Sequence, residues 1–287
     1  MHIESGTRGP YAAPMLRAIR HPDARAFLGR AEPWLLEREA EANIILAVAY
    51  LVEQGAKPFI EPAYFATVES QGRVVGCAMR PPPDGLYVTD FPPAAVATIA
   101  AQLKELFAAV PEVTGPEAVA VEFARCWSGQ AWRVYGRHRR YVLDAVLPPQ
   151  AAAGALRVGA TSDLVVLEDW AVRYAAEIGS KVDTSAFFRI MVERGTLYLW
   201  DDGGPRSVVT ASGFTPNGVR ISAAYTPPEF RGRGYAGSAV AAVSRTMLET
   251  GRRFCVIDAD ADNPITNSIY RKIGYRPIEE HVLIHLD

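Results

Sequence analysis

The feature that most constrains the fold is a glycine-rich loop that joins a strand pattern to a helix pattern. Residues 219–225 alternate in a way that is typical of a strand. Prolines at 227–228 end this strand because proline cannot donate to a ladder, and Gly232 and Gly234 then precede a helical pattern over residues 237–249. Glycine lets a backbone approach a ligand closely, and the N-terminus of a helix favours an anion. The sequence therefore predicts a loop that binds pyrophosphate.

Two other kinds of phosphate-binding loop have distinct requirements. A P-loop needs Gly-Lys followed by Ser or Thr, and the chain has no such tripeptide. The spacing of Gly232, Gly234 and Gly237 matches the dinucleotide fingerprint, with Asp258 near its later acidic position. However, several residues separate the strand from the first glycine, and too little chain follows Asp258 for a doubly wound domain. An NAD-dependent oxidoreductase is therefore kept only as an alternative.

Two ordered motifs carry a family resemblance. The pattern Arg-x-x-Gly-x-Ala at residues 231–236 resembles the acetyl-CoA loop of the GNAT superfamily of N-acyltransferases. The segment 263–275 is similar to that family's Asn-x-x-Ala-x-x-Leu-Tyr-x-x-x-Gly-Phe motif. It departs from the motif conservatively at three positions, Thr266, Ile269 and Tyr275. The two motifs together cover about residues 219–277.

The resemblance implies acetyl-CoA as the co-substrate and no metal. The end of the strand would lend backbone groups to pantetheine, the loop N–H groups would hold the pyrophosphate, and Asn263 would hydrogen-bond the pantetheine arm. The residues expected to bind the cofactor are Ala224, Tyr225, Thr226, Arg231, Gly232, Arg233, Gly234, Tyr235, Ala236, Asn263 and Asn267.

The expected catalytic residues are Tyr270 and Glu229. The resemblance implies that Tyr270 protonates the leaving sulfur, and a tyrosine holds its proton at neutral pH. Asn263 and Tyr270 are seven residues apart, which places them on one face of a helix. Glu229 directly precedes the loop and is the expected general base. Asp258, Asp260 and water are alternatives for that role.

Composition indicates a soluble globular protein. The chain has 287 residues, of which 49% are hydrophobic and 22% charged, with a net charge of −2. This charge gives no reason to expect nucleic acid or an anionic membrane as a partner. No apolar run is long enough to span a membrane, and the three cysteines are far apart with no metal-binding spacing. We expect a cytoplasmic protein.

The order of elements indicates an internal duplication. Both halves read as a strand, two helices, three strands, a helix, a strand, a helix and a strand. The expected fold class is α/β (α+β), with two tandem GNAT-like domains, each a mixed, mostly antiparallel sheet flanked by helices. The expected divisions are a disordered leader at 1–14, a degenerate GNAT-like domain at 15–148, a linker at 148–154 and an acetyl-CoA-binding GNAT domain at 155–287.

The resulting functional hypothesis is an acetyl-CoA-dependent N-acyltransferase. It would move an acetyl group to a primary amine of a small molecule or peptide by direct transfer in a ternary complex, because no cysteine in either motif suggests an acyl-enzyme. A CoA-binding sensor or scaffold without turnover is the first alternative, and the NAD-dependent oxidoreductase is the second. An amino acid, an aminoglycoside, a polyamine or a protein amine would each suit as the acceptor. The motifs do not specify an oligomeric state.

Overall fold

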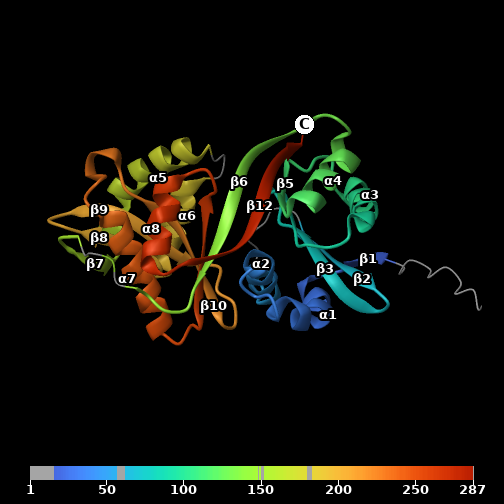
Figure 1. Ribbon diagram of the computed structural model, residues 1–287, viewed down its shortest axis with the longest axis horizontal. Helices are drawn as coiled ribbons and strands as arrows, with labels where there is room; N and C mark the ends of the chain where they lie inside the picture. The colour runs from blue at the N-terminus through green and yellow to red at the C-terminus, as the bar shows by residue number, and fades with distance from the viewer. Residues whose placement is uncertain (1–15, 57–61, 148, 150–151, 180–182, 287) are drawn as a thin grey trace, which may run out of the picture.

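The computed structural model describes residues 16–56, 62–147, 149, 152–179 and 183–286. The expected leader at 1–14 and part of the expected linker at 148–154 lie outside these residues. The described strands form one twelve-stranded sheet with helices packed against it (Figure 1). No helix in these ranges is long and apolar enough to cross a membrane.

The first half begins the sheet and ends on a long strand. Its elements are β1 (Leu16–His21), α1 (Ala24–Leu36), α2 (Asn43–Glu53), β2 (Tyr64–Ser70), β3 (Arg73–Arg80), β4 (Leu86–Val88), η1 (Pro93–Ala95), α3 (Val96–Leu106), β5 (Glu112–Gly115), α4 (Glu117–Ser128) and β6 (Trp132–Leu143).

The second half repeats the order of strands and α-helices, as expected from the sequence. Its elements are β7 (Ala155–Val158), η2 (Thr161–Asp163), α5 (Leu164–Ile178), α6 (Thr184–Glu193), β8 (Leu197–Asp201), β9 (Pro205–Ser212), β10 (Gly218–Tyr225), η3 (Pro228–Phe230), α7 (Tyr235–Glu249), β11 (Phe254–Asp260), α8 (Pro264–Ile273) and β12 (Arg276–Leu286).

Local side-chain chemistry starts several of these helices. The side chains of Asp23, Asp183 and Asn263 each accept a hydrogen bond from a backbone N–H three residues later, which caps α1, α6 and α8. Pro264 follows Asn263 at the first position of α8, where its missing N–H is not needed. These caps fix the residues at which the three helices begin.

The last strand of each half completes the sheet of the other half. The strand order is β1-β2-β3-β4-β5-β12-β6-β11-β10-β9-β8-β7, so β12 lies beside β5, and β6 lies beside β11. The two exchanged strands also pair with each other along their length (Figure 1). Among the described strands, only β4–β5 and β10–β11 pair in parallel, which confirms a mixed, mostly antiparallel sheet. The sequence predicted a sheet in each half, and the exchange joins the two sheets into one.

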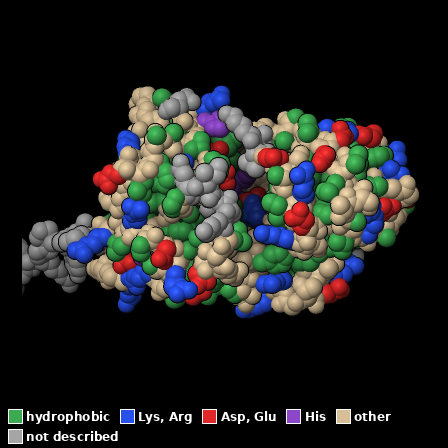
Figure 2. Space-filling model, turned by 180° about the vertical axis from the view of Figure 1, so that it is seen from behind, with side chains coloured by type: hydrophobic (Ala, Val, Ile, Leu, Met, Phe, Trp, Pro, Cys, Tyr) green, Lys and Arg blue, Asp and Glu red, His purple; other side chains and the backbone are tan. Residues whose placement is uncertain are grey.

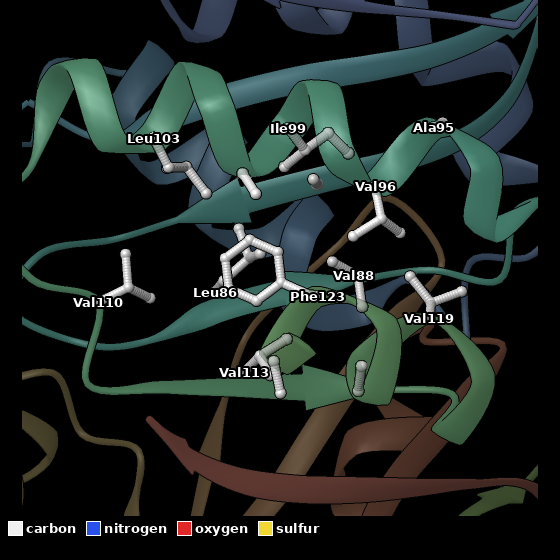
Figure 3. Close-up of a cluster of buried hydrophobic side chains, with 14 of the residues drawn as sticks. Leu86, Val88, Ala95, Val96, Ile99, Leu103, Val110, Val113, Val119 and Phe123 are labelled. Atoms are coloured by element: carbon white, nitrogen blue, oxygen red, sulfur yellow. The ribbon is translucent and has the colours of Figure 1, made fainter. Parts of the chain in front are cut away.

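Buried side chains explain why the exchange is stable. Tyr141 and Leu143 of β6 are fully buried in a cluster formed otherwise by the second half. Val282 and Ile284 of β12 are buried in the cluster of the first half. Figure 3 shows part of this first-half cluster, in which side chains from α3, α4 and neighbouring strands meet, among them Leu86, Val88, Ile99, Leu103, Val113 and Phe123. Each half therefore depends on the other for part of its core.

A polar contact also joins the halves. The carboxylate of Glu39, in the segment between α1 and α2, accepts hydrogen bonds from the backbone N–H groups of Asn217 and Gly218, at 2.8 and 3.1 Å. It also accepts one from the Asn217 side chain at 2.7 Å. The side chain of Asn43 donates to the backbone oxygen of Gly213 at 2.9 Å. The segment between α1 and α2 is thus fixed against the turn that leads into β10.

We predict that Leu143→Ala destabilises the protein by about 2–5 kcal/mol, because it removes a fully buried side chain from the core. Val134→Ala is the matched control, since Val134 lies on the same strand and is 38% exposed. Its expected cost is within about 0.5 kcal/mol. Urea unfolding, followed by far-UV circular dichroism, measures both. Equal costs for the two variants would contradict the placement of β6 in the core of the second half.

Candidate functional site

The parallel strands β10 and β11 part soon after they begin to pair. Their pairing covers only Gly218–Arg220 of β10 and Phe254–Val256 of β11, although β10 continues to Tyr225. Further along β10, Ala223 has a φ of 48°, and the register with β9 shifts between Ser222 and Tyr225. The carboxyl end of β10 therefore has backbone groups that do not pair with β11.

The loop after β10 presents free backbone donors. Gly232 and Gly234 adopt φ values of 79° and 81°, in the left-handed region that favours glycine. Gly234 is also the N-cap of α7. Within the described residues, the N–H groups from Arg233 to Gly237 make no hydrogen bond to the protein. A row of free donors at the start of a 15-residue helix favours an anion.

A cavity of about 730 Å³ lies against this loop. Its walls come from the end of β10, the loop, the start of α7, α5 and α8. Nine of the expected cofactor residues line it: Ala224, Tyr225, Thr226, Arg231, Gly232, Gly234, Tyr235, Ala236 and Asn263. Arg233, Asn267, Tyr270 and Glu229 do not line it.

Side chains at the mouth of the cavity already have partners. Arg231 donates through Nε to the backbone oxygen of Thr226 at 2.9 Å, and through one terminal nitrogen to both carboxylate oxygens of Glu177 at 2.7 Å. The Tyr235 hydroxyl donates to Asp202 at 2.6 Å. A phosphate bound by Arg231 would therefore share this cation with Glu177 or displace the carboxylate.

The two asparagines of the second motif have different environments. Asn263 caps α8, with its side-chain oxygen accepting from the N–H groups of Ile265 and Thr266 at 3.2 and 3.1 Å. Asn267 is buried, and its side-chain nitrogen donates to backbone oxygens that include that of Asp260. Its oxygen accepts from the Tyr141 hydroxyl. Asn263 reaches the cavity, whereas the side chain of Asn267 holds the start of α8 against β11 and β6.

Tyr270 lies in the core next to the cavity. It is 6% exposed, and its ring lies 6.0 Å from that of Tyr141 and 5.8 Å from that of Tyr275. Its neighbours on α8, Ile269 and Ile273, line the cavity. Burial raises the pKa of Tyr270 well above its usual value, so the hydroxyl keeps its proton at neutral pH.

Glu229 is on the surface and bound to an arginine. Arg173 of α5 donates to its two carboxylate oxygens at 3.1 and 2.7 Å. The hydrogen bonds from Arg173 lower the pKa of Glu229, which makes its carboxylate a weaker proton acceptor. Its assignment as general base stays a prediction.

Asp258 is at the centre of a buried charge cluster. Arg140 of β6 donates to its two oxygens at 2.9 and 3.1 Å, and Arg220 of β10 donates to one of them. Burial alone would raise the pKa of Asp258, but Arg220 and Arg140 outweigh it and hold the pKa well below its usual value. A carboxylate held in this way stays ionised and pairs strands β6, β10 and β11 rather than accepting a proton.

His138 and His281 lie near Asp258, and one possible ligand atom from each of the three residues lies within 4.8 Å of the other two. Such a set can hold a metal ion in principle. Here both carboxylate oxygens are occupied by guanidinium donors, and the positive charges of Arg140 and Arg220 oppose a second cation. The donor set does not fit a metal site.

The structure thus places a glycine loop at a helix N-terminus beside a parted pair of parallel strands, as the two motifs predicted. Consistent with this arrangement, the model of the FR47-like protein family matches residues 206–284, which contain both motifs. Mycothiol acetyltransferase from Corynebacterium aurimucosum is 30% identical over 95 residues, a segment that makes up 30% of this chain and 31% of that relative. The alignment therefore spans less than a third of the relative's length.

Several solved structures share the fold over most of the chain. A Drosophila protein has a TM-score of 0.67 at 13% identity and covers 96% of this chain and 99% of its own. A GCN5-related N-acetyltransferase from Sphaerobacter thermophilus has a TM-score of 0.61 at 14% identity, with coverage of 93% and 94%. A tandem GNAT protein from the clavulanic acid biosynthesis pathway has a TM-score of 0.57 at 15% identity, with coverage of 94% and 98%. The chain therefore shares the GNAT fold, and together with the family model that matches residues 206–284 this confirms the resemblance found in its motifs.

Sequence motifs did not reveal the part of the site that α5 supplies. Tyr174 and Glu177 of this helix line the cavity, and Glu177 holds Arg231. They are three residues apart and so share one helix face, but only the packing of α5 against β10 shows that this face meets the cavity. Lys272 of α8 also lines it and adds a positive charge.

We predict that Asp258→Asn lowers the free energy of unfolding by about 3–5 kcal/mol at pH 7, because it leaves two buried guanidinium groups without their anion. The pKa of Asp258 is lower in the folded protein than in the unfolded chain. Its ionised form therefore stabilises the fold above about pH 4, and this stabilisation is lost as the pH falls through the folded-state pKa. The difference in the free energy of unfolding between the parent and Asp258→Asn should become smaller below about pH 4.

Urea unfolding across this pH range measures the effect. Asp262→Asn is the matched control, since Asp262 is exposed and its carboxylate has no bonded partner among the described residues. An equally small loss of unfolding free energy in both variants would contradict the stabilising role of the charge cluster around Asp258.

Proposed function

We propose that this protein is an acetyl-CoA-dependent N-acetyltransferase whose cofactor binds to the second half. The observation that carries the proposal is a single cavity. It extends from the end of β10 that does not pair with β11 to the free N–H groups at the start of α7. An elongated ligand with a pyrophosphate and an amide-containing arm would use both features. Relatives named as acetyltransferases support the same activity.

In this proposal, most of the expected residues have a distinct task toward the cofactor. The free N–H groups from Gly232 to Ala236 bind the pyrophosphate. The Arg231 guanidinium adds positive charge, shared between the phosphate and Glu177. The backbone at 224–226 pairs with the amides of the pantetheine arm, as a further strand would. Asn263 binds the same arm. Tyr235 shapes the wall, and Arg233 contributes its backbone N–H.

The chemistry needs a polarised carbonyl, a neutral amine and a proton for the departing thiolate. Bound acetyl-CoA supplies an activated thioester. The amine nitrogen forms the new C–N bond as the C–S bond breaks, and Tyr270 gives its phenolic proton to the sulfur. Glu229 is the proposed acceptor of the amine proton, with the ion pair to Arg173 opposing that role. Transfer is direct, within a ternary complex.

The same proposal includes the domain boundaries, the acceptor and the cellular compartment. We propose a first domain at 15–148 without a cofactor loop and a second domain at 155–287 that binds acetyl-CoA, with β6 and β12 exchanged between them. The acceptor is the primary amine of a small molecule or peptide, the compartment is the cytoplasm, and neither nucleic acid nor a membrane is a partner. A CoA-binding sensor would share the cavity but would not need the proton of Tyr270.

We predict that acetyl-CoA and CoA raise the melting temperature of the parent, while NAD and ATP do not. A ligand at about a hundred times its Kd stabilises by roughly 2.7 kcal/mol. Gly234→Trp should abolish the shift because its side chain enters the cavity and its φ of 81° disfavours any side chain. Gly195→Trp is the matched control, since Gly195 also has a positive φ and open space around it, but lies outside the cavity. A shift with NAD alone would favour the oxidoreductase and overturn the proposal.

We predict that Tyr270→Phe lowers the rate of amine acetylation by about 10²–10⁴-fold, the usual range for a general acid. Acetyl-CoA should still bind with nearly the parent affinity, because phenylalanine keeps the ring that packs beside Tyr141 and Tyr275 and removes only the hydroxyl. Tyr275→Phe is the control, since that hydroxyl is also buried but hydrogen-bonds Ser244 at 2.8 Å. Acetylation of an amine panel, followed by mass spectrometry, gives the rates. Equal rates for the parent and Tyr270→Phe would remove Tyr270 from the chemistry.

A further inference from the structure

A second cavity, of about 450 Å³, lies where the first half meets the exchanged strands. It is enclosed by the end of α1, the segment leading into α2, strands β3 to β5, and residues of β6 and β12. Viewed from the side opposite to Figure 1, the molecule is hollowed between the halves, with charged and histidine side chains at the floor of the hollow (Figure 2). The cavity shares no lining residue with the proposed cofactor site.

Three carboxylates in the cavity wall lack full neutralisation. Within the described residues, Glu41 and Asp90 have no hydrogen bond or ion pair through their carboxylates, and Glu279 has only a 3.6 Å contact with Arg140. Arg140 itself is committed to Asp258 and to the backbone oxygen of Glu41. The wall therefore carries more negative charge than its own cations balance.

The second cation in the wall is also committed. The guanidinium of Arg38 lies 3.9 Å from the ring centre of Trp34 and donates to the backbone oxygen of that residue. Its other terminal nitrogen is 3.7 Å from Glu37. The Arg38 guanidinium thus interacts with residues at the end of α1 and does not neutralise the carboxylates across the cavity.

His281 supplies an independent sign of a missing ligand. It is 4% exposed, and its Nδ1 has no partner among the described residues, while its Nε2 lies 3.9 Å from Asp258. Burial, opposed by Asp258 and assisted by Arg140, lowers the pKa of His281 to about 3, so the ring is neutral at physiological pH. A buried polar atom without a partner is costly, and a ligand in the cavity that His281 lines would satisfy it.

The remaining wall suits the carbon body of such a ligand. Trp34 and Tyr87 contribute aromatic rings, and Ile44 and Ile45 contribute aliphatic surface. A cavity of this size that combines apolar surface with convergent polar groups is typical of a small-molecule site. The negative wall selects a cation, and aromatic rings also favour cations.

We propose that this cavity binds a small organic cation with at least two amino groups, and that this molecule is the acyl acceptor. The acceptor role rests on the proposed function. Glu279 of β12 pairs with Arg140 of β6, and Arg140 pairs with Asp258 of β11. Strand β12 is therefore two strand spacings away from β11. Strands in a sheet are about 4.8 Å apart, so the cavity lies about 10 Å from the edge where β11 parts from β10. One ammonium group would bind Glu41, Asp90 and Glu279, and the second amine would reach toward that edge.

The test uses 1,8-diaminooctane as the probe and 1,8-octanediol as its uncharged match, titrated calorimetrically into the full chain at pH 8.5 without CoA. Burial raises the pKa of Glu279 to about 7, so its carboxylate is ionised under these conditions. Glu279→Gln and Asp90→Asn should each weaken binding of the diamine by about tenfold, as expected for the loss of one ionic hydrogen bond. Glu280→Gln, at the next and exposed position of β12, should not. The diol should not bind.

Failure to bind the diamine, or equal binding of the diol, would overturn the inference. Neither result would contradict the proposed cofactor site. Binding that is unchanged in both Glu279→Gln and Asp90→Asn would also overturn it, and Asp90 is exposed, so its variant should fold as the parent does. Adding acetyl-CoA tests the acceptor role, because mass spectrometry should then detect acetylated diamine. Diamine binding without a CoA-induced melting shift would contradict the proposed function alone.

Discussion

The exchange of β6 and β12 is the constraint on which the rest of the structure depends. Each strand lies in the sheet of the opposite half, and each buries side chains in the core of that half. The two strands also pair with each other, so the sheet has no break between the halves. The two sheets that the sequence predicted are therefore one continuous sheet. Neither half contains all the strands that its own core requires.

The exchange also places charged side chains that line the second cavity. Because β6 lies beside β11, Arg140 meets Asp258, and because β12 lies beside β6, Glu279 and His281 follow on the next strand. Arg220 joins the same carboxylate from β10, close to the point where β10 and β11 part. The ion pairs therefore fix three strands that lie between the proposed cofactor cavity on one side and the proposed acceptor cavity on the other. Their burial makes them costly to remove and rigid while they are present.

The sequence predicted the features that depend on local chemistry. Gly234 at the start of α7 and Asn263 at the start of α8 act on residues within one helical turn, so the motifs sufficed to place them. The repeated order of elements was predicted for the same reason. The exchange was not, because the alternating pattern of a strand does not say which edge it joins. The contact of Arg140 with Asp258 joins residues 118 positions apart and follows only from that pairing. The contact of Glu177 with Arg231 joins residues 54 positions apart and follows from the packing of α5 near the loop.

The central claim is that the free N–H groups at the start of α7 hold the pyrophosphate of acetyl-CoA. Amide hydrogen exchange of the parent, with and without acetyl-CoA, tests this claim directly. The N–H groups from Arg233 to Gly237 make no hydrogen bond within the described chain, so they should exchange rapidly without ligand. The account predicts that acetyl-CoA slows exchange in this segment. Unchanged exchange there, with acetyl-CoA bound and protection elsewhere, would contradict the account.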